Sequence, residues 1–216
     1  MAPGAKGRRV AIIQSGYLPW KGYFDIIHDV DLFVFLDDVQ FTLRDWRTRN
    51  LLKTAQGSTW LTIPVGSHRD LCIDEIRLAN ASWQVRHWAT LRHTYGKAPY
   101  FPHYRAFFED LYLGRTWESL SALNQHVVRT VAKDFLGLRA EFQDARPLDT
   151  HGRKTPRLLQ ILKKCDATLY VTGPTTRCYL DVALLADEGI QTVFKDFEGF
   201  PSCTPPNNSR APSSPR

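Results

Sequence analysis

Several features that would point to common protein classes are scarce in this sequence of 216 residues. It has four cysteines, and their spacing matches neither a metal-binding motif nor a dense disulfide framework, so we expect reduced thiols in a cytoplasmic protein. No apolar run approaches the roughly 18 residues that a membrane span requires. The basic N-terminus lacks the apolar core of a signal peptide. The seven histidines show no tight ligand spacing, and we therefore predict no metal site.

The composition shows an excess of positive charge. The chain carries 28 Lys and Arg against 22 Asp and Glu, a formal net charge of +6. This balance favours an anionic ligand, whereas the scattered placement of the basic residues makes nucleic acid the less favoured partner. At 43% hydrophobic and 12% aromatic, the chain can build a sizeable core. Its length fits one domain.

The first fifty residues contain a strand-helix-strand pattern. A short apolar run at Val10–Ile13 is followed by a Gly/Pro break, a helical spacing of apolar residues around Tyr23–Ile27, and a second apolar run at Leu32–Leu36. This order is typical of a βαβ unit. Further strands are predicted at 168–172 and 191–195, and further helices at 155–162 and 179–188. Strands that alternate with helices predict an α/β fold with a mainly parallel, Rossmann-like sheet.

The middle of the chain breaks this alternation. We predict a basic loop at 41–54, strands at 59–65 and 73–78, and an inserted helical segment at about 82–136. The last sixteen residues hold five Pro and four Ser, a composition that cannot bury a core. The expected organisation is a disordered lead-in at 1–8, a single α/β domain at 9–200 and a disordered tail at 201–216.

Candidate site residues follow the first two strands. In βαβ units, ligands gather beyond the carboxyl ends of the strands, where Gln14 follows the first strand and Asp37 and Asp38 follow the second. Either carboxylate can take a proton from an attacking amine, and both are therefore candidate catalytic residues. Strand alternation allows only one of them to point into a given site. The structural alternative is that one caps a turn and the other pairs with an arginine.

Arg49 and Asn50 are the best candidates for binding a phosphate or carboxylate, because the guanidinium offers a planar fork of donors. A structural salt bridge is the alternative for Arg49. Lys21 would add charge at a helix N-terminus, where anions are favoured. The remaining candidates for substrate binding are Tyr17, Trp20, Tyr23, Trp46 and Lys97.

The densest motifs are YLPWKGYF (17–24), DLFVFLDDVQF (31–41) and WRTRN (46–50), followed by WLTIPV (60–65), YGKAPYF (95–101), Gly173-Pro174 and YLD (179–181). Together they resemble the WbqC-like protein family over about residues 10–200. The sequence departs from the family pattern at Ser15-Gly16, where members usually have Pro after the first Gln. It also departs in its Pro/Ser-rich tail, which looks truncated or frame-shifted.

The resemblance implies a function. Members occur among bacterial O-antigen and surface-polysaccharide genes, with a proposed role in transferring glycine or a similar amino acid to an amino sugar. We therefore expect a transferase that attaches an aminoacyl or acyl group to an amino sugar or nucleotide-sugar. Free glycine carries no leaving group, so ATP or an aminoacyl-tRNA would have to activate it. The alternative is a non-catalytic module that binds a nucleotide or a sugar.

A second resemblance is to nucleotidyltransferase-like α/β folds, which place a His-x-Gly-His motif after the first strand to hold ATP phosphates. The matching segment here is Trp20-Lys-Gly-Tyr23, which lacks that histidine chemistry.

Overall fold

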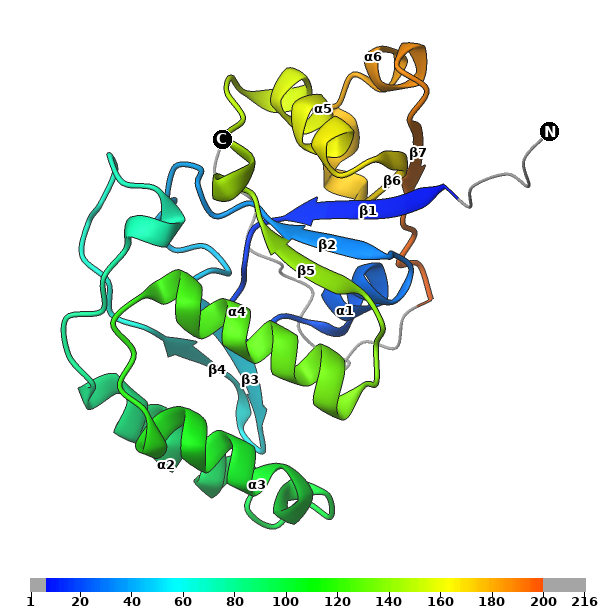
Figure 1. The fold of residues 1–216 in the computed structure, drawn as a ribbon. Coiled ribbons are helices and arrows are strands. Elements are labelled where there is room, and N and C mark those ends of the chain that lie inside the picture. Colours follow the sequence, from blue (N-terminus) through cyan, green and yellow to red (C-terminus); the bar gives the residue numbers. More distant parts are fainter. Residues whose placement is uncertain (1–6, 200–216) are drawn as a thin grey trace.

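The centre of the molecule is a sheet of five parallel strands in the order β5-β2-β1-β6-β7 (Figure 1). The structure is a computed structural model that describes residues 7–199, so residues 1–6 of the predicted lead-in and the whole predicted tail lie outside it. The strands are β1 (Arg8–Ile13), β2 (Leu32–Phe35), β5 (Glu141–Asp144), β6 (Ala167–Thr172) and β7 (Gln191–Phe194). The predicted Rossmann-like α/β fold is confirmed. The strand order reverses direction between β1 and β6, which is the topological switch point where such sheets bind ligands.

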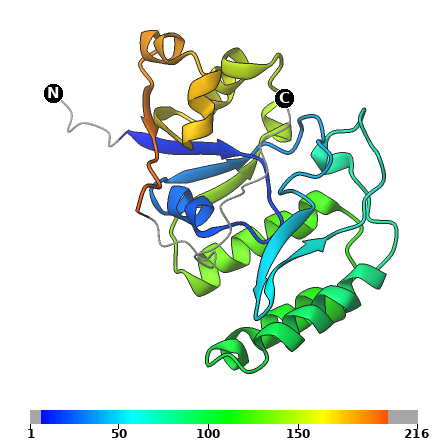
Figure 2. The same ribbon diagram turned by 180° about the vertical axis from the view of Figure 1, so that it is seen from behind.

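Helices cover both faces of this sheet (Figures 1 and 2). One face carries α1 (Lys21–His28) and α4 (Leu120–Thr130), and the other carries α5 (Lys154–Lys164) and α6 (Val182–Asp187). The strands are buried from both sides, which explains why β2 reads LFVF without alternation. None of the helices in residues 7–199 is long and apolar enough to cross a membrane.

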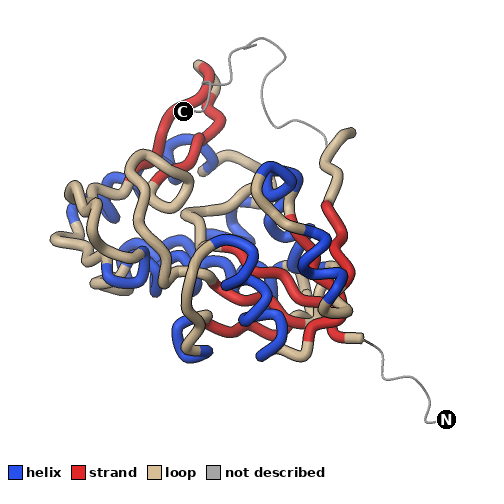
Figure 3. The backbone as a smooth tube through the Cα atoms, turned by 90° about the horizontal axis from the view of Figure 1, so that it is seen from above, coloured by secondary structure: helices blue, strands red, loops and turns tan. Residues whose placement is uncertain are grey.

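The segment between β2 and α4 forms a separate antiparallel hairpin and two further helices. These elements are β3 (Arg49–Thr54), β4 (Gly57–Thr62), α2 (Ser82–Tyr95) and α3 (Phe101–Glu109). Figure 3 shows the hairpin standing apart from the strands of the central sheet. Single helical turns complete the fold at η1 (Ile73–Glu75), η2 (Asp110–Gly114), η3 (Val131–Phe135), η4 (Arg146–Leu148) and η5 (Pro174–Cys178).

Two predictions for this segment are wrong. The basic stretch 41–54 is not a loop throughout, because its second half pairs as β3 with β4. The first half of the predicted strand at 73–78 is a 3₁₀ turn, η1, in which the Glu75 carboxylate accepts a hydrogen bond from the backbone N–H of Cys72 at 2.7 Å. Such a local bond competes with strand pairing. The apolar residues that mimic alternation, Ile73 and Ile76, are both buried in the same core.

Helix α4 joins the two parts of the molecule. Leu123 and Val127 pack into the core formed with the hairpin and α2, whereas Val128 packs with α1 against the central sheet. Ser119 begins the helix as its N-cap, accepting a hydrogen bond from the N–H of Ala122 at 3.3 Å. The same helix therefore carries apolar side chains on two adjacent faces and fixes the inserted part against the sheet.

Candidate functional site

A polar cavity of about 320 Å³ lies beyond the carboxyl ends of β2 and β5. Three segments of the chain line it: the residues after β2, the turn after β5, and the loop that leads into α5 together with the first turn of that helix. Its lining residues are Asp38, Arg146, Asp149, Thr150, His151, Gly152 and Arg157. Its size is at the lower end of the range for small-molecule sites in proteins.

Asp38 forms the charged wall of this cavity with Arg157. Arg157 Nη2 lies 2.6 Å from Asp38 Oδ2, and only 13% and 11% of the two side chains are exposed. Arg157 Nη1 also donates to the Asp38 backbone oxygen at 3.3 Å. The other carboxylate oxygen, Oδ1, is buried and has no hydrogen-bond partner among the described residues. A buried acceptor without a donor costs about 1–3 kcal/mol, which the ion pair with Arg157 has to offset.

Arg146 supplies a second guanidinium. Its Nη2 donates to Asp74 Oδ1 at 2.6 Å and its Nε to the other oxygen of Asp74, forming a bidentate pair. The hydrogen bonds to Asp74 raise the pKa of Arg146 further, so it keeps its charge at every accessible pH. More than half of the Arg146 side chain remains exposed, and its Nη1 takes no part in the pair with Asp74, so Nη1 can donate to a ligand phosphate.

The loop between β5 and α5 is held in an unusual backbone conformation. Asp149, Gly152 and Lys154 have φ angles of 46°, 92° and 54°, in the left-handed region that favours glycine. Side chains of α5 hold the loop, since Gln160 bonds both the N–H and the carbonyl of His151 at 3.2 and 3.0 Å. Strained backbone persists where surrounding contacts enforce it, and it is frequent at ligand sites.

Asp37 lies outside this cavity lining and is buried in the protein. Its Oδ1 accepts the backbone N–H of Ser15 at 2.8 Å, and its Oδ2 accepts from the Ser121 hydroxyl and, at 3.2 Å, from Gln125 Nε2. These contacts tie the end of β1 to α4. The two adjacent aspartates, which both follow the end of β2, thus have different surroundings.

The aromatic candidates after β1 also serve the framework. The Tyr23 hydroxyl donates to the Gln14 carbonyl at 3.1 Å, whereas no hydrogen bond of the Gln14 side chain is seen in the described residues. The Tyr17 hydroxyl lies between Tyr112 and His87 Nδ1, the latter at 2.8 Å, and His87 Nε2 lies 3.2 Å from the Thr62 carbonyl. Burial lowers the pKa of His87 to about 4, so this ring is neutral at pH 7.

The other candidates lie on the hairpin or at exposed positions. Asn50 faces inward and donates from Nδ2 to the carbonyls of Leu18 at 2.5 Å and Tyr17 at 3.2 Å. Arg49 and Trp46 lie on the outer side of the hairpin, with Arg49 stacked on Trp60. Three candidates are exposed: Lys21 at the start of α1, Lys97 after α2, and Trp20 just before α1. None of these residues lines the polar cavity.

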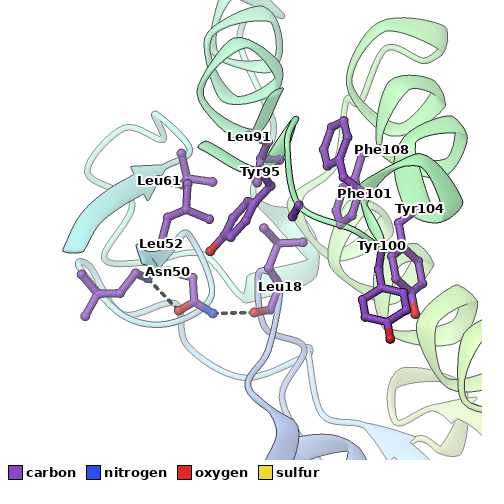
Figure 4. A pocket seen from close by; sticks show the side chains of 12 residues that line it. Leu18, Asn50, Leu52, Leu61, Leu91, Tyr95, Tyr100, Phe101, Tyr104 and Phe108 are labelled. Carbon is purple, nitrogen blue, oxygen red and sulfur yellow. Dashed lines mark hydrogen bonds between the residues drawn. The ribbon is translucent and has the colours of Figure 1, made fainter. Parts of the chain in front are cut away.

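A second, apolar groove of about 400 Å³ separates the hairpin from α2 and α3 (Figure 4). The Leu18 side chain reaches into it, and Asn50 holds the Leu18 backbone at a φ of 47°. The lining residues are Leu18, Asn50, Leu51, Leu52, Leu61, Leu91, Tyr95, Ala98, Tyr100, Phe101, Tyr104 and Phe108. The sequence does not predict this groove, because its lining residues come from three segments that are distant in the chain.

Sequence reasoning also missed the basic residues of the polar cavity. Arg157 lies 119 positions from Asp38 in the chain, and Arg146 lies 72 from Asp74, so no local pattern joins either pair. The stretch HGRK (151–154) ahead of α5 was the available signal, because it places a glycine and basic side chains at the start of a helix.

Comparison with known proteins agrees with the sequence motifs. The model of the WbqC-like protein family matches residues 14–206. The chain is 35% identical over 196 residues to "Uncharacterized protein Rv1507c" of Mycobacterium tuberculosis (strain ATCC 25618 / H37Rv), covering 89% of this chain and 84% of that protein. No solved structure matches the chain.

Proposed function

Because the chain belongs to the WbqC-like protein family, we propose that it is a transferase for amino sugars. The transferred group is an aminoacyl group such as glycyl, or another acyl group. The acceptor is an amino sugar or nucleotide-sugar of bacterial surface-polysaccharide or related biosynthesis. The observation that carries the proposal is the polar cavity, which places the Asp38 carboxylate beside two guanidinium groups beyond the strand ends.

In this proposal the arginines bind the anionic part of the acceptor. Arg146 is the more exposed of the two and suits a phosphate oxygen, while Arg157 holds the Asp38 carboxylate in place. Arginine is favoured at such sites because its donor fork matches phosphate geometry.

The reaction needs a neutral amine, because an ammonium group has no lone pair for attack. In the proposed step the amine nitrogen attacks the carbonyl carbon of an activated donor, and the amine proton passes to Asp38. The bond to the leaving group then breaks, releasing AMP from an acyl adenylate formed with ATP, or the tRNA from an aminoacyl-tRNA. General-base help of this kind typically contributes a factor of about 10²–10⁴ in rate.

One observation favours the second candidate, a module that binds a nucleotide or sugar without chemistry. Asp38 Oδ1 is closed off from solvent, and its Oδ2 is engaged by Arg157. The Asp38 carboxylate is therefore poorly placed to take a proton from a ligand amine.

Product analysis separates the two. The protein is incubated with a nucleotide-sugar that bears a free amine, and with either ATP plus glycine or glycyl-tRNA, and the sugar is followed by mass spectrometry. The transferase predicts a gain of one glycyl group in the wild type and its loss in Asp38→Asn. Lys163→Met, on the distant surface of α5, is the matched control and should keep the activity. Binding of the nucleotide-sugar with no mass change under either donor would establish the module instead.

A further inference from the structure

The outer face of hairpin β3–β4 is a surface that the proposed transfer reaction does not use. Alternation along the strands points one set of side chains inward, where Leu52 and Leu61 are buried, and the other set outward. The outward set consists of Arg49, Leu51 and Lys53 on β3 with Ser58, Trp60 and Thr62 on β4, and Trp46 lies against it from the preceding loop.

Large aromatic side chains are exposed on this face. Trp46 is 57% exposed and Trp60 is 39% exposed, and Leu51, the cross-strand partner of Trp60, is 42% exposed. The two Trp ring centroids are 5.7 Å apart, and the Arg49 guanidinium lies 4.3 Å from the centre of the Trp60 ring. A cation stacked on an exposed indole, with a second indole beside it, is a ready platform for another flat ring.

The charge of the face is positive. Arg49 and Lys53 belong to it, and Arg44 is exposed in the loop before β3. None of the outward residues of the hairpin is acidic, and Asp45 in the neighbouring loop is paired with Arg47. A ligand that complements this face has a flat ring to stack on the indoles and a negative charge to meet the cations. A nucleotide, with its base and its phosphate, has both.

The spacing of the cations favours a strand of nucleotides over a single one. Arg49 and Lys53 are four residues apart on one strand, which places their backbone positions about 13 Å apart. We propose that the outer face of the hairpin binds a segment of single-stranded nucleic acid, with bases stacked on Trp46 and Trp60 and phosphates against Arg49 and Lys53. This inference goes beyond the transfer reaction and stands whether or not that reaction occurs.

The test is fluorescence anisotropy of labelled 12-nucleotide RNA and DNA strands titrated with the full chain, with uridine monophosphate as competitor. Stacking on an aromatic ring is worth enough per base that Trp60→Ala and Trp46→Ala should each weaken binding about 5- to 100-fold. Trp60→Phe keeps a ring and should retain most of the affinity. The matched control is Tyr179→Ala, because Tyr179 is an aromatic of similar exposure, at 50%, outside the hairpin. Circular dichroism melts check that each variant folds.

Salt dependence gives a second readout. Each phosphate contact to a single strand contributes about −0.7 to the slope of log affinity against log salt. Lys53→Met should make the slope shallower by about that amount, whereas Lys163→Met should leave it unchanged. RNA bound more tightly than DNA would assign the ligand to RNA, and equal binding would assign it to single strands in general. No binding of either strand, affinity unchanged in both Trp variants, or displacement by uridine monophosphate at the strand's own affinity would overturn the proposal.

Discussion

At the scale of single residues, Asp38 and Arg157 are the pair on which the proposed site depends. Both side chains are mostly buried, so removing either charge leaves the other buried without a counter-charge. We predict that Asp38→Asn and Arg157→Gln each lower the free energy of unfolding by about 1–3 kcal/mol. The double variant should lose less free energy of unfolding than the two single losses added together. Urea denaturation of the four proteins measures this coupling. Strictly additive losses would mean that the two side chains do not depend on each other.

His87 gives the molecule a predictable response to pH. Its pKa is about 4 in the folded protein because of burial, against about 6.5 when unfolded, so the unfolded chain binds more protons between these values. Stability that is present above pH 6.5 is therefore lost as the pH falls toward 4, by about 2–3 kcal/mol in all. Urea denaturation at pH 7 and pH 4.5 should show this loss in the wild type and a smaller one in His87→Phe.

The control for His87 is His126. Burial also lowers the pKa of His126, but this side chain is only half-buried. His126→Gln should keep most of the wild-type loss between pH 7 and 4.5. An equal pH dependence in the wild type and His87→Phe would show that the buried ring is not its source.

At the scale of elements, hairpin β3–β4 and the loop after β1 depend on each other. Asn50 on β3 uses its amide to hold the carbonyls of Tyr17 and Leu18, and Leu18 has a left-handed backbone that costs about 1–2 kcal/mol. Asn50→Ala should lower the free energy of unfolding by about 2 kcal/mol, roughly that of two hydrogen bonds. Thr62→Ala, on the exposed face of the same hairpin, should change it by less than about 0.5 kcal/mol. Equal losses from both substitutions in urea denaturation would contradict the role of Asn50.

The elements also show how far the sequence could predict this fold. The apolar run at β2 and the Gly/Pro breaks are local signals, and the βαβ unit they predict is present. The predicted strand at 59–65 overlaps β4, whereas β3 was missed because its outward residues Arg49, Leu51 and Lys53 include two cations, so its charge resembles that of a loop. Of the predicted site residues, Asp38, which follows a strand, lines the polar cavity. The sequence did not point to Arg146 and Arg157, because only tertiary folding brings them to the cavity.

At the scale of the whole molecule, α4 connects the inserted part to the central sheet, and we expect the two parts to unfold together. Its side chains enter the cores of both parts. Five of the six tryptophans lie between Trp46 and Trp117, so their fluorescence reports the inserted part, whereas far-ultraviolet circular dichroism reports the whole chain. We predict that thermal unfolding followed by the two signals gives one shared midpoint. Two midpoints several degrees apart would show that the parts unfold separately.

The central claim is that the polar cavity beyond β2 and β5 is where the anionic acceptor binds, and a calorimetric titration with a nucleotide-sugar bearing a free amine tests it most directly. Hydrogen bonds to charged groups are worth about 1.5–3 kcal/mol. Arg146→Met should therefore weaken binding about 10- to 100-fold, while Trp60→Ala on the hairpin should leave it unchanged. Undiminished affinity in a folded Arg146→Met protein, together with a loss in Trp60→Ala, would contradict the account and move the acceptor to the hairpin.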